Sequence, residues 1–221
     1  MTETTSPLSA SSTSSTSSTP FALADVPGDD VPLRVAVVVG SNREGRFGPI
    51  VAEWLYARVR ERSDLELDVV DLADSDLPTA LSFSPSDAVA AELGKVTPKL
   101  AAADAFVVLT PEYNHSYPAS LKSLIDWHHA EWQAKPVAFV SYGGLSGGLR
   151  AVEHLRPVFA ELHTVTIRDT VSFHNAGALF DDEGNHRDPA GADAAAKVML
   201  DQLTWWGWAL RAAKAVRAYG S

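Results

Sequence analysis

Cysteine is absent from the sequence, and so is any apolar run long enough to cross a bilayer. Without cysteine, the 221-residue chain cannot form disulfides or use thiolate chemistry. The N-terminal end has neither the basic region nor the continuous apolar region of a signal peptide. These absences exclude a disulfide-stabilised fold and a membrane span, and we expect a cytoplasmic protein without a membrane partner.

Basic residues are scarce relative to acidic ones. The chain holds 18 Lys and Arg against 28 Asp and Glu, which gives a formal net charge of −10. Four of the acidic residues precede residue 31, where no basic residue occurs, so −6 remains on residues 34–221. A chain with this charge repels a phosphate backbone, and a nucleic-acid partner is therefore not expected.

Residues 1–32 lack both basic side chains and an apolar period. The segment is rich in Ser and Thr, and it cannot bury enough apolar surface to offset the conformational entropy lost on ordering. We therefore expect residues 1–32 to be disordered. Residues 33–221 contain no internal repeat and are expected to form one domain.

Beyond residue 33, strand-like and helix-like segments alternate. The strand-like segments are mostly continuous apolar runs, which indicates burial on both faces of a parallel sheet covered by helices. One predicted helix contains Pro98, which is tolerated only if the helix begins late enough to place this proline in its first turn. The predicted fold is α/β, a doubly wound five-stranded parallel sheet with helices on both faces. The expected strands are 34–40, 66–72, 105–110, 136–141 and 165–173, and the expected helices are 49–62, 91–103, 118–132, 147–161 and 193–219.

Ligands of such folds bind outside the carboxyl ends of the strands, and unusual loops follow the first, third and fourth strands. The first loop, GSNREGRFGPI at 40–50, combines glycines with two arginines and runs into a helix N-terminus. Backbone N–H groups, the helix dipole and the guanidinium groups of Arg43 and Arg46 would together favour a phosphate. A flexible loop with two solvated arginines is the alternative.

The first loop does not match two common nucleotide motifs. It lacks the Lys of G-x-x-x-x-G-K-[ST], which argues against a P-loop nucleotidase. Asn42 stands where G-x-G-x-x-G needs its second Gly, although Asp71, at the end of the second strand, could imitate the acid that binds ribose. A Rossmann NAD site is therefore a minor alternative.

The second and third loops have the features of a site for a flat ligand with a polar edge. The second, PEYNHSYP, offers apolar walls in Pro111 and Tyr113 and a hydrogen-bonding amide in Asn114. The third, SYGGLSGG at 141–148, has four glycines, which either let the backbone approach a planar group or form a flexible turn. A phosphate loop, an aromatic and amide loop and a glycine loop, in this order, point to FMN.

The stretches GSNREGRFG, PEYNHSYPASLKSLIDW and SYGGLSGG resemble the NADPH-dependent FMN reductases, a flavodoxin-like family that includes quinone, chromate and azo-dye reductases. Where many relatives have Ser or Thr and then Asn, this chain has Arg46 and Gly48, and Arg46 would replace a hydroxyl with a charged partner. The resemblance implies that the first loop holds the phosphate and ribityl chain, the second the isoalloxazine ring, and the third the other edge of that ring. The implied residues are Ser41, Arg43, Arg46, Phe47 and Gly48, then Pro111, Glu112, Tyr113 and Asn114, then Ser141, Tyr142, Gly143 and Gly144.

The resemblance also implies an activity. In a ping-pong reaction, NADPH or NADH would reduce FMN and leave, and the flavin would then pass electrons to a small-molecule acceptor. Since the flavin carries the chemistry, no catalytic base is predicted. A homodimer or homotetramer formed through the helix after PEYN is expected. A non-enzymatic electron carrier of flavodoxin type shares the fold and the acidity, and it is the alternative.

No metal site is predicted. His128, His129 and Glu131 lie too close together in sequence to form a tetrahedral zinc site by themselves, so we expect a surface cluster at a helix end. The neighbouring Trp127 and Trp132 are expected in the core or at a subunit interface.

Overall fold

Five parallel strands form a sheet in the order β2-β1-β3-β4-β5. The computed structural model describes Met1 and residues 31–220. In β1 (Leu33–Val39), Val35 pairs with Leu67 of β2 on one side and with Ala105 of β3 on the other. The expected doubly wound α/β fold is confirmed, with the strand order of flavodoxin. The strands are β1 (Leu33–Val39), β2 (Leu65–Asp71), β3 (Ala105–Pro111), β4 (Pro136–Gly143) and β5 (Val165–His174).

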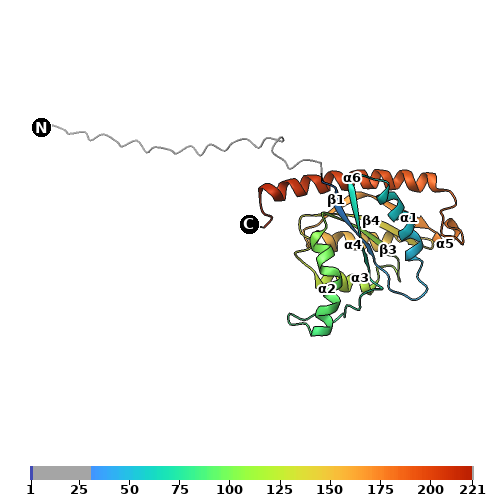
Figure 1. Cartoon of the computed structure of the whole chain (residues 1–221), viewed down its shortest axis with the longest axis horizontal. Coiled ribbons are helices and arrows are strands. Elements are labelled where there is room, and N and C mark those ends of the chain that lie inside the picture. The colour runs from blue at the N-terminus through green and yellow to red at the C-terminus, as the bar shows by residue number, and fades with distance from the viewer. Residues whose placement is uncertain (2–30, 221) are drawn as a thin grey trace.

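Helices cover both faces of the sheet. They are α1 (Gly48–Arg60), α2 (Asp87–Ala102), α3 (Ala119–Trp127), α4 (Leu149–Glu161), α5 (Ala176–Leu179) and α6 (Pro189–Val216). Val35, Val37 and Val39 of β1 pack in the core beneath α1 and α6, whereas Ala36 and Val38 pack in the core beneath α2, α3 and α4. Figure 1 shows α6 along one edge of the molecule, with α2 and α3 on the opposite side of the strands. Because side chains alternate along a strand, two covered faces require a continuous apolar run.

The helix with Pro98 differs from its expected range. Helix α2 begins at Asp87, because Ser86 caps it by accepting a hydrogen bond from the Val89 N–H at 3.4 Å. Pro98 therefore lies inside the helix and not in its first turn. Pro98 is exposed, and the carbonyl group that loses its helical partner belongs to Gly94, which is also exposed and can bond to water.

Other helix ends also differ from the expected ranges. Helix α3 ends at Trp127, well before 132, because His128 has an extended backbone with φ −128° and ψ 138°. Helix α4 begins at Leu149, because Gly147 and Gly148 have φ values of +61° and +84°. The short helix α5 was not expected at all.

The cluster expected on the surface near residue 128 is partly buried. His128 is 4% exposed, its Nε2 lies 2.8 Å from Thr97 Oγ1, and its Nδ1 lies 2.8 Å from the Leu124 carbonyl oxygen. The surface expectation is therefore wrong for His128, because the chain turns inward after α3. Trp132 is fully buried against Phe106 in the core, one of its two expected places. Within residues 31–220, no group of three or more His, Asp or Glu side chains could hold a metal ion.

The expected disordered segment, 1–32, lies almost wholly outside the described residues, and its disorder stays a prediction. At the start of the described range 31–220, Arg211 of α6 donates hydrogen bonds to the carbonyl groups of Val31 at 2.7 Å and Pro32 at 3.2 Å. Among the helices of the described part, none has the length and apolarity needed to cross a membrane.

Candidate functional site

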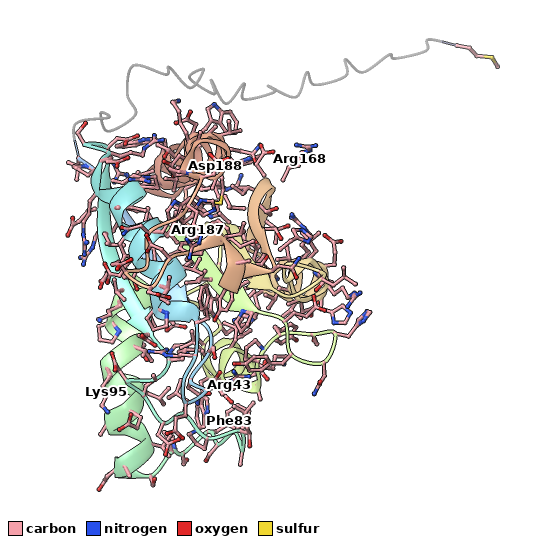
Figure 2. The ribbon with its side chains drawn as sticks, turned by 90° about the vertical axis from the view of Figure 1, so that its right-hand side faces the viewer. Arg43, Phe83, Lys95, Arg168, Arg187 and Asp188 are labelled. Carbon is pink, nitrogen blue, oxygen red and sulfur yellow. The ribbon has the colours of Figure 1, made fainter. Side chains whose placement is uncertain are left out.

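A cavity of about 550 Å³ opens at the carboxyl ends of the central strands. All three loops singled out in the sequence contribute to it, together with the segment after β5. The cavity lies where the strand order reverses between β1 and β3, and its volume is in the range of small-molecule sites. Figure 2 shows Arg43 and Phe83, from the loops after β1 and β2, at this end of the molecule. The lining residues are Arg43, Arg46, Phe47, Pro111, Glu112, Tyr113, Tyr142, Gly143, Gly144, Asn175, Ala176, Gly177 and Ala178.

The loop after β1 presents Arg43 to the cavity. Gly45 has φ +65°, and the Arg46 N–H donates to the Arg43 carbonyl at 3.2 Å, which turns the chain into α1. The Arg43 guanidinium lies 5.9 Å from the centroid of the Tyr113 ring, and within residues 31–220 no carboxylate forms an ion pair with it. Helix α1 has Phe47 at its N-cap position, without a side-chain cap and without an acidic residue in its first turn. An unpaired arginine beside an uncapped helix N-terminus is suited to bind an anion.

Arg46 lies in the same loop but is held by the protein itself. Its guanidinium forms a two-pronged ion pair with Asp71 at the end of β2, with one contact of 2.6 Å, and also donates to the Ser41 carbonyl at 2.6 Å. The hydrogen bonds to Asp71 raise the pKa of Arg46 against the opposing effect of burial. Since Asp71 is occupied by Arg46, it is not free to bind a ribose, and the Rossmann alternative loses its acidic residue.

The loop after β3 makes a tight two-residue turn. Tyr113 and Ser116 exchange backbone hydrogen bonds of 2.8 Å and 3.0 Å around Asn114 and His115, whose φ values are +49° and +74°. Positive φ at both central residues defines a type I′ turn, and Asn tolerates this conformation better than most residues. The Asn114 side chain is exposed at the tip and does not line the cavity. The structure therefore gives Asn114 a role in the turn.

Glu112 joins the loop after β3 to the start of α4. It accepts hydrogen bonds from the Ser146 hydroxyl at 2.7 Å, the Arg150 backbone N–H at 3.2 Å and the Arg150 guanidinium at 2.9 Å. Burial opposes ionisation of Glu112, but these hydrogen bonds outweigh it, and its pKa lies below the usual value. Because Gly148 has no side chain to cap α4, Glu112 supplies the cap from another loop.

Aromatic side chains form the apolar walls of the cavity. Phe47 packs between Tyr142, with ring centroids 6.1 Å apart, and Phe180, at 5.7 Å. Tyr113 is held by a 2.6 Å hydrogen bond to the hydroxyl of Ser41, which is fully buried. Burial raises the pKa of Tyr142, so its hydroxyl stays protonated. The predicted residue Gly48 lets Tyr142 approach, since a Cβ there would lie 2.9 Å from the Tyr142 hydroxyl.

The loop after β4 brings backbone to the cavity at Gly143 and Gly144. A Cβ at Gly144 would meet nothing within 4 Å, whereas a Cβ at Gly143 would lie 3.3 Å from the Gly148 nitrogen. Ser141 is fully buried and donates to the Gly147 carbonyl at 2.8 Å, so it shapes the loop from behind. Of this predicted group, Tyr142, Gly143 and Gly144 line the cavity.

A fourth segment, residues 175–178, was missed in the sequence. Asn175 has φ +51°, and its N–H donates to the Gly144 carbonyl at 2.9 Å, which fixes the segment against the loop after β4. The sequence signal was present, because Asn175 and Gly177 follow directly after the weakest predicted strand. Small residues at the end of a strand mark a turn, and this turn falls at the same edge of the sheet.

The fold and the position of the cavity indicate a flavodoxin-like α/β protein, and comparison with solved structures agrees with this class. A flavoenzyme NAD(P)H:(acceptor) oxidoreductase from Paracoccus denitrificans superposes with a TM-score of 0.63 at 23% identity, over 79% of this chain and 97% of that chain. An NADH:FMN oxidoreductase gives a TM-score of 0.60 at 21% identity, over 77% and 90%. At these identities the likeness concerns the fold, which is that of a flavodoxin-like α/β protein.

The family model for NADPH-dependent FMN reductase matches residues 33–178, and the chain belongs to this family. An NAD(P)H-dependent FMN reductase of Schizosaccharomyces pombe is 37% identical over 122 residues, which are 52% of this chain and 60% of that protein. A probable NADPH:quinone oxidoreductase of Oryza sativa subsp. japonica is 34% identical over 181 residues, 76% of this chain and 89% of that protein. An FMN-dependent NADPH-azoreductase of Staphylococcus haemolyticus is 30% identical over 180 residues, 77% and 93%. Membership makes the protein an oxidoreductase of a family that uses FMN and NAD(P)H.

Proposed function

We propose that this protein transfers electrons from NAD(P)H through FMN to a quinone, a free flavin, an azo compound or a metal oxyanion. The observation that carries the proposal is the cavity at the reversal point of the sheet, where the loops after β1, β3 and β4 converge. The names of the relatives support the choice of acceptors, since the rice protein is described as a quinone oxidoreductase and the staphylococcal protein as an azoreductase.

The phosphate of FMN fits the N-terminal end of α1. Arg43 is the guanidinium that remains available there, because Arg46 is engaged with Asp71. The uncapped backbone N–H groups at the start of α1 add donors and the positive end of the helix dipole. Ser41 and Arg46, predicted to face the phosphate and the ribityl chain, also hold the loop in shape, through hydrogen bonds with Tyr113 and Asp71.

The isoalloxazine ring fits the space between the loops after β3 and β4. Pro111, Tyr113 and Tyr142 offer apolar surface, and the backbone of Gly143 and Gly144 offers unhindered polar groups for the ring edge. The open space at the absent Gly144 Cβ is the observation that fits a flat group lying close to the backbone. FMN, when bound, supplies the electron transfer, first from NAD(P)H and then to the acceptor. The chain binds and orients the flavin, and Phe47, packed on two aromatic rings, excludes water from one wall.

We further propose a homodimer or homotetramer that forms through α3. Tyr117, two residues before this helix, and Trp127, its last residue, are half-buried and leave apolar surface for a partner. Trp127 is held by a 2.7 Å hydrogen bond from its Nε1 to the Pro78 carbonyl, so its exposed edge has a fixed position.

The test is steady-state NAD(P)H oxidation by the FMN-loaded protein with a series of quinones. We expect repeated turnover at about 1 to 1000 per second and parallel double-reciprocal lines, the pattern of a ping-pong reaction. The protein without FMN is the control and should not turn over. If the protein binds FMN but oxidises NAD(P)H only when a separate reductase is added, it is an electron carrier and the proposal is wrong.

A further inference from the structure

The turn after β4 holds an apolar side chain in water at the mouth of the cavity. Leu145 is 85% exposed and directly follows Gly144, which lines the cavity. Leu149, the first residue of α4, is 42% exposed and lies four positions further along the chain. Turn tips usually carry small or polar residues, because an apolar side chain there stays in contact with water. Apolar surface kept in water beside a cavity is one mark of a ligand-binding surface.

Hydrogen bonds on two sides fix the position of this turn. The Ser146 hydroxyl donates to a carboxylate oxygen of Glu112 at 2.7 Å, and His174 Nδ1 donates to the Leu145 carbonyl at 2.9 Å. Glu112 lines the cavity, and His174 directly precedes Asn175, which lines it as well. The backbone of Leu145 is therefore tied to two parts of the cavity wall, and its side chain is held at the mouth.

The segment that adjoins the turn leaves room for a ligand. The Asn175 N–H donates to the Gly144 carbonyl at 2.9 Å, which sets residues 175–178 against the turn. A Cβ at Gly177 would meet nothing within 4 Å, and Ala178 adds only a methyl group to the lining of the cavity. The space beside the turn is therefore open to a chain that leaves the cavity.

We propose that Leu145 and Leu149 form an acceptor subsite, which binds the apolar substituent of a quinone whose ring reacts inside the cavity. This inference rests on the proposed function and specifies its acceptor. Over one turnover, NAD(P)H supplies two electrons and one proton and water supplies a second proton, so the quinone leaves as a hydroquinone. The substituent takes no part in this reaction. It is held because its apolar surface and that of the two leucines leave water together.

The chemistry of the leucines separates this ligand from the others that the site takes. Neither leucine lines the cavity, so a flavin ring inside it leaves both side chains free. NAD(P)H carries phosphates and hydroxyl groups, which do not benefit from contact with an apolar surface. A metal oxyanion has no apolar part at all. An alkyl or isoprenoid substituent is the part of an acceptor that this surface suits.

The first experiment measures kcat/KM for a series of benzoquinones whose alkyl substituent grows by one methylene group at a time. For the wild type, kcat/KM should rise about twofold for each of the first methylene groups, about half the effect of full burial in free energy. Leu145→Ser should abolish most of this rise, whereas Leu145→Met, which keeps the apolar surface, should retain it. Val198→Ser removes an exposed apolar side chain from α6 and should leave the dependence on chain length unchanged.

The dependence on chain length distinguishes the subsite from a general defect. Since Leu145 is 85% exposed, its variants should fold like the wild type. A damaged site would lower kcat/KM for all members of the series by the same factor, and the rise with chain length would remain.

The second experiment measures binding without turnover. Para-alkylphenols have a flat ring and an alkyl chain but accept no electrons, so calorimetric titration of the oxidised, FMN-loaded protein gives their dissociation constants. In the wild type and in Leu145→Met, the dissociation constant should fall about twofold per methylene group. In Leu145→Ser it should depend much less on chain length.

Three results would overturn the proposal. One is a wild type that reduces quinones with a kcat/KM independent of chain length. Another is a Leu145→Ser protein that keeps the full dependence in either experiment. The last is a Leu145→Ser protein whose mass in sedimentation falls below that of the wild type while the dependence remains, since the turn would then contact a second copy of the chain. A protein that oxidises NAD(P)H with no quinone would refute the proposed function and this acceptor with it, whereas turnover without dependence on chain length would refute the subsite alone.

Discussion

The end of β4 and the loop after it contain two pairs of glycines that serve different parts of the molecule. Gly143 and Gly144 line the cavity, and a Cβ at Gly144 would meet open space. Gly147 and Gly148 have positive φ, and a Cβ at Gly148 would lie 2.7 Å from the Ser141 Cβ. One pair therefore leaves room for a ligand, and the other builds the turn that starts α4.

The loop after β1 is divided in the same way between two arginines. Arg43 is exposed at the cavity, whereas Arg46 is tied to Asp71 with side chains only 15% and 20% exposed. Both loops thus place a residue of the scaffold within a few positions of a residue of the site. Residue type alone does not tell a residue of the scaffold from a residue of the site. Substitutions of scaffold residues and of site residues should have different consequences.

The largest effect on stability is expected from a change at Gly148, which builds the turn before α4. Gly148→Ala forces a Cβ into backbone at φ +84° and against Ser141, so strain and overpacking together should cost about 3 kcal/mol. For a domain of this size, the melting temperature should fall by about 6 to 12 °C. Circular dichroism during heating measures this. Gly94→Ala, in an exposed part of α2, is the matched control and should be neutral or slightly stabilising. Equal melting of the Gly148 variant and the wild type would contradict the assignment.

The next largest effect on stability is expected from breaking the ion pair between Arg46 and Asp71. Asp71→Ala leaves the half-buried Arg46 guanidinium without its carboxylate, and we expect a loss of about 2 kcal/mol in the free energy of unfolding. Urea denaturation of the protein without FMN measures it. Adding Arg46→Ala should cost much less than it does in the wild type, because the two residues act as a pair. Simple additivity of the two losses would show that the pair has no energetic role.

A change at Gly144, which lines the cavity, should affect the affinity for FMN but not the stability of the protein. Gly144→Val should leave the melting temperature of the FMN-free protein unchanged, since nothing in the protein lies within 4 Å of its Cβ. It should weaken FMN binding by about tenfold or more, about 1.4 kcal/mol, because the side chain enters the space of the ring. Fluorescence titration with FMN measures the affinity. Full affinity in this variant would move the ring away from Gly144.

The smallest effect concerns pH and Tyr56, which lies on α1 away from the cavity. Burial raises the pKa of Tyr56 to about 12, above its usual value of about 10. The stabilisation is complete below about pH 10 and is lost as the pH rises towards about 12, because only the unfolded chain releases this proton readily. Between about pH 8 and pH 11, the free energy of unfolding of the wild type should fall by about 1 kcal/mol more than that of Tyr56→Phe. Urea midpoints at both pH values would show it, and an unchanged loss would refute it.

The sequence predicted the sheet well because its signal is local. Continuous apolar runs mark β1, β3 and β4, which are buried on both faces, whereas the edge strands β2 and β5 are less buried and have weaker sequence patterns. Helix ends were predicted less well, since Ser86 and the positive φ of Gly147 and Gly148 decide them. These are backbone conformations that a periodic pattern does not encode.

The site was predicted as a set of loops, but the roles within the loops were not. The partner of Arg46 is Asp71, 25 positions away, and the partner of Glu112 is Arg150, 38 positions away. Such contacts arise from the order of the strands and cannot be read from a motif. The segment at Asn175 was missed for the same reason, because the last strand carries it to the cavity from far along the chain.

Titration of the FMN-free protein with FMN and with riboflavin tests the division between Arg43 and Arg46 most directly. Arg43→Ala removes a charged hydrogen-bond partner, so the FMN dissociation constant should rise by about tenfold to a hundredfold while that of riboflavin, which has no phosphate, changes little. An Arg46→Ala protein should lose stability and weaken both ligands alike. Equal weakening of FMN and riboflavin by Arg43→Ala, or a loss confined to FMN in Arg46→Ala, would contradict the account.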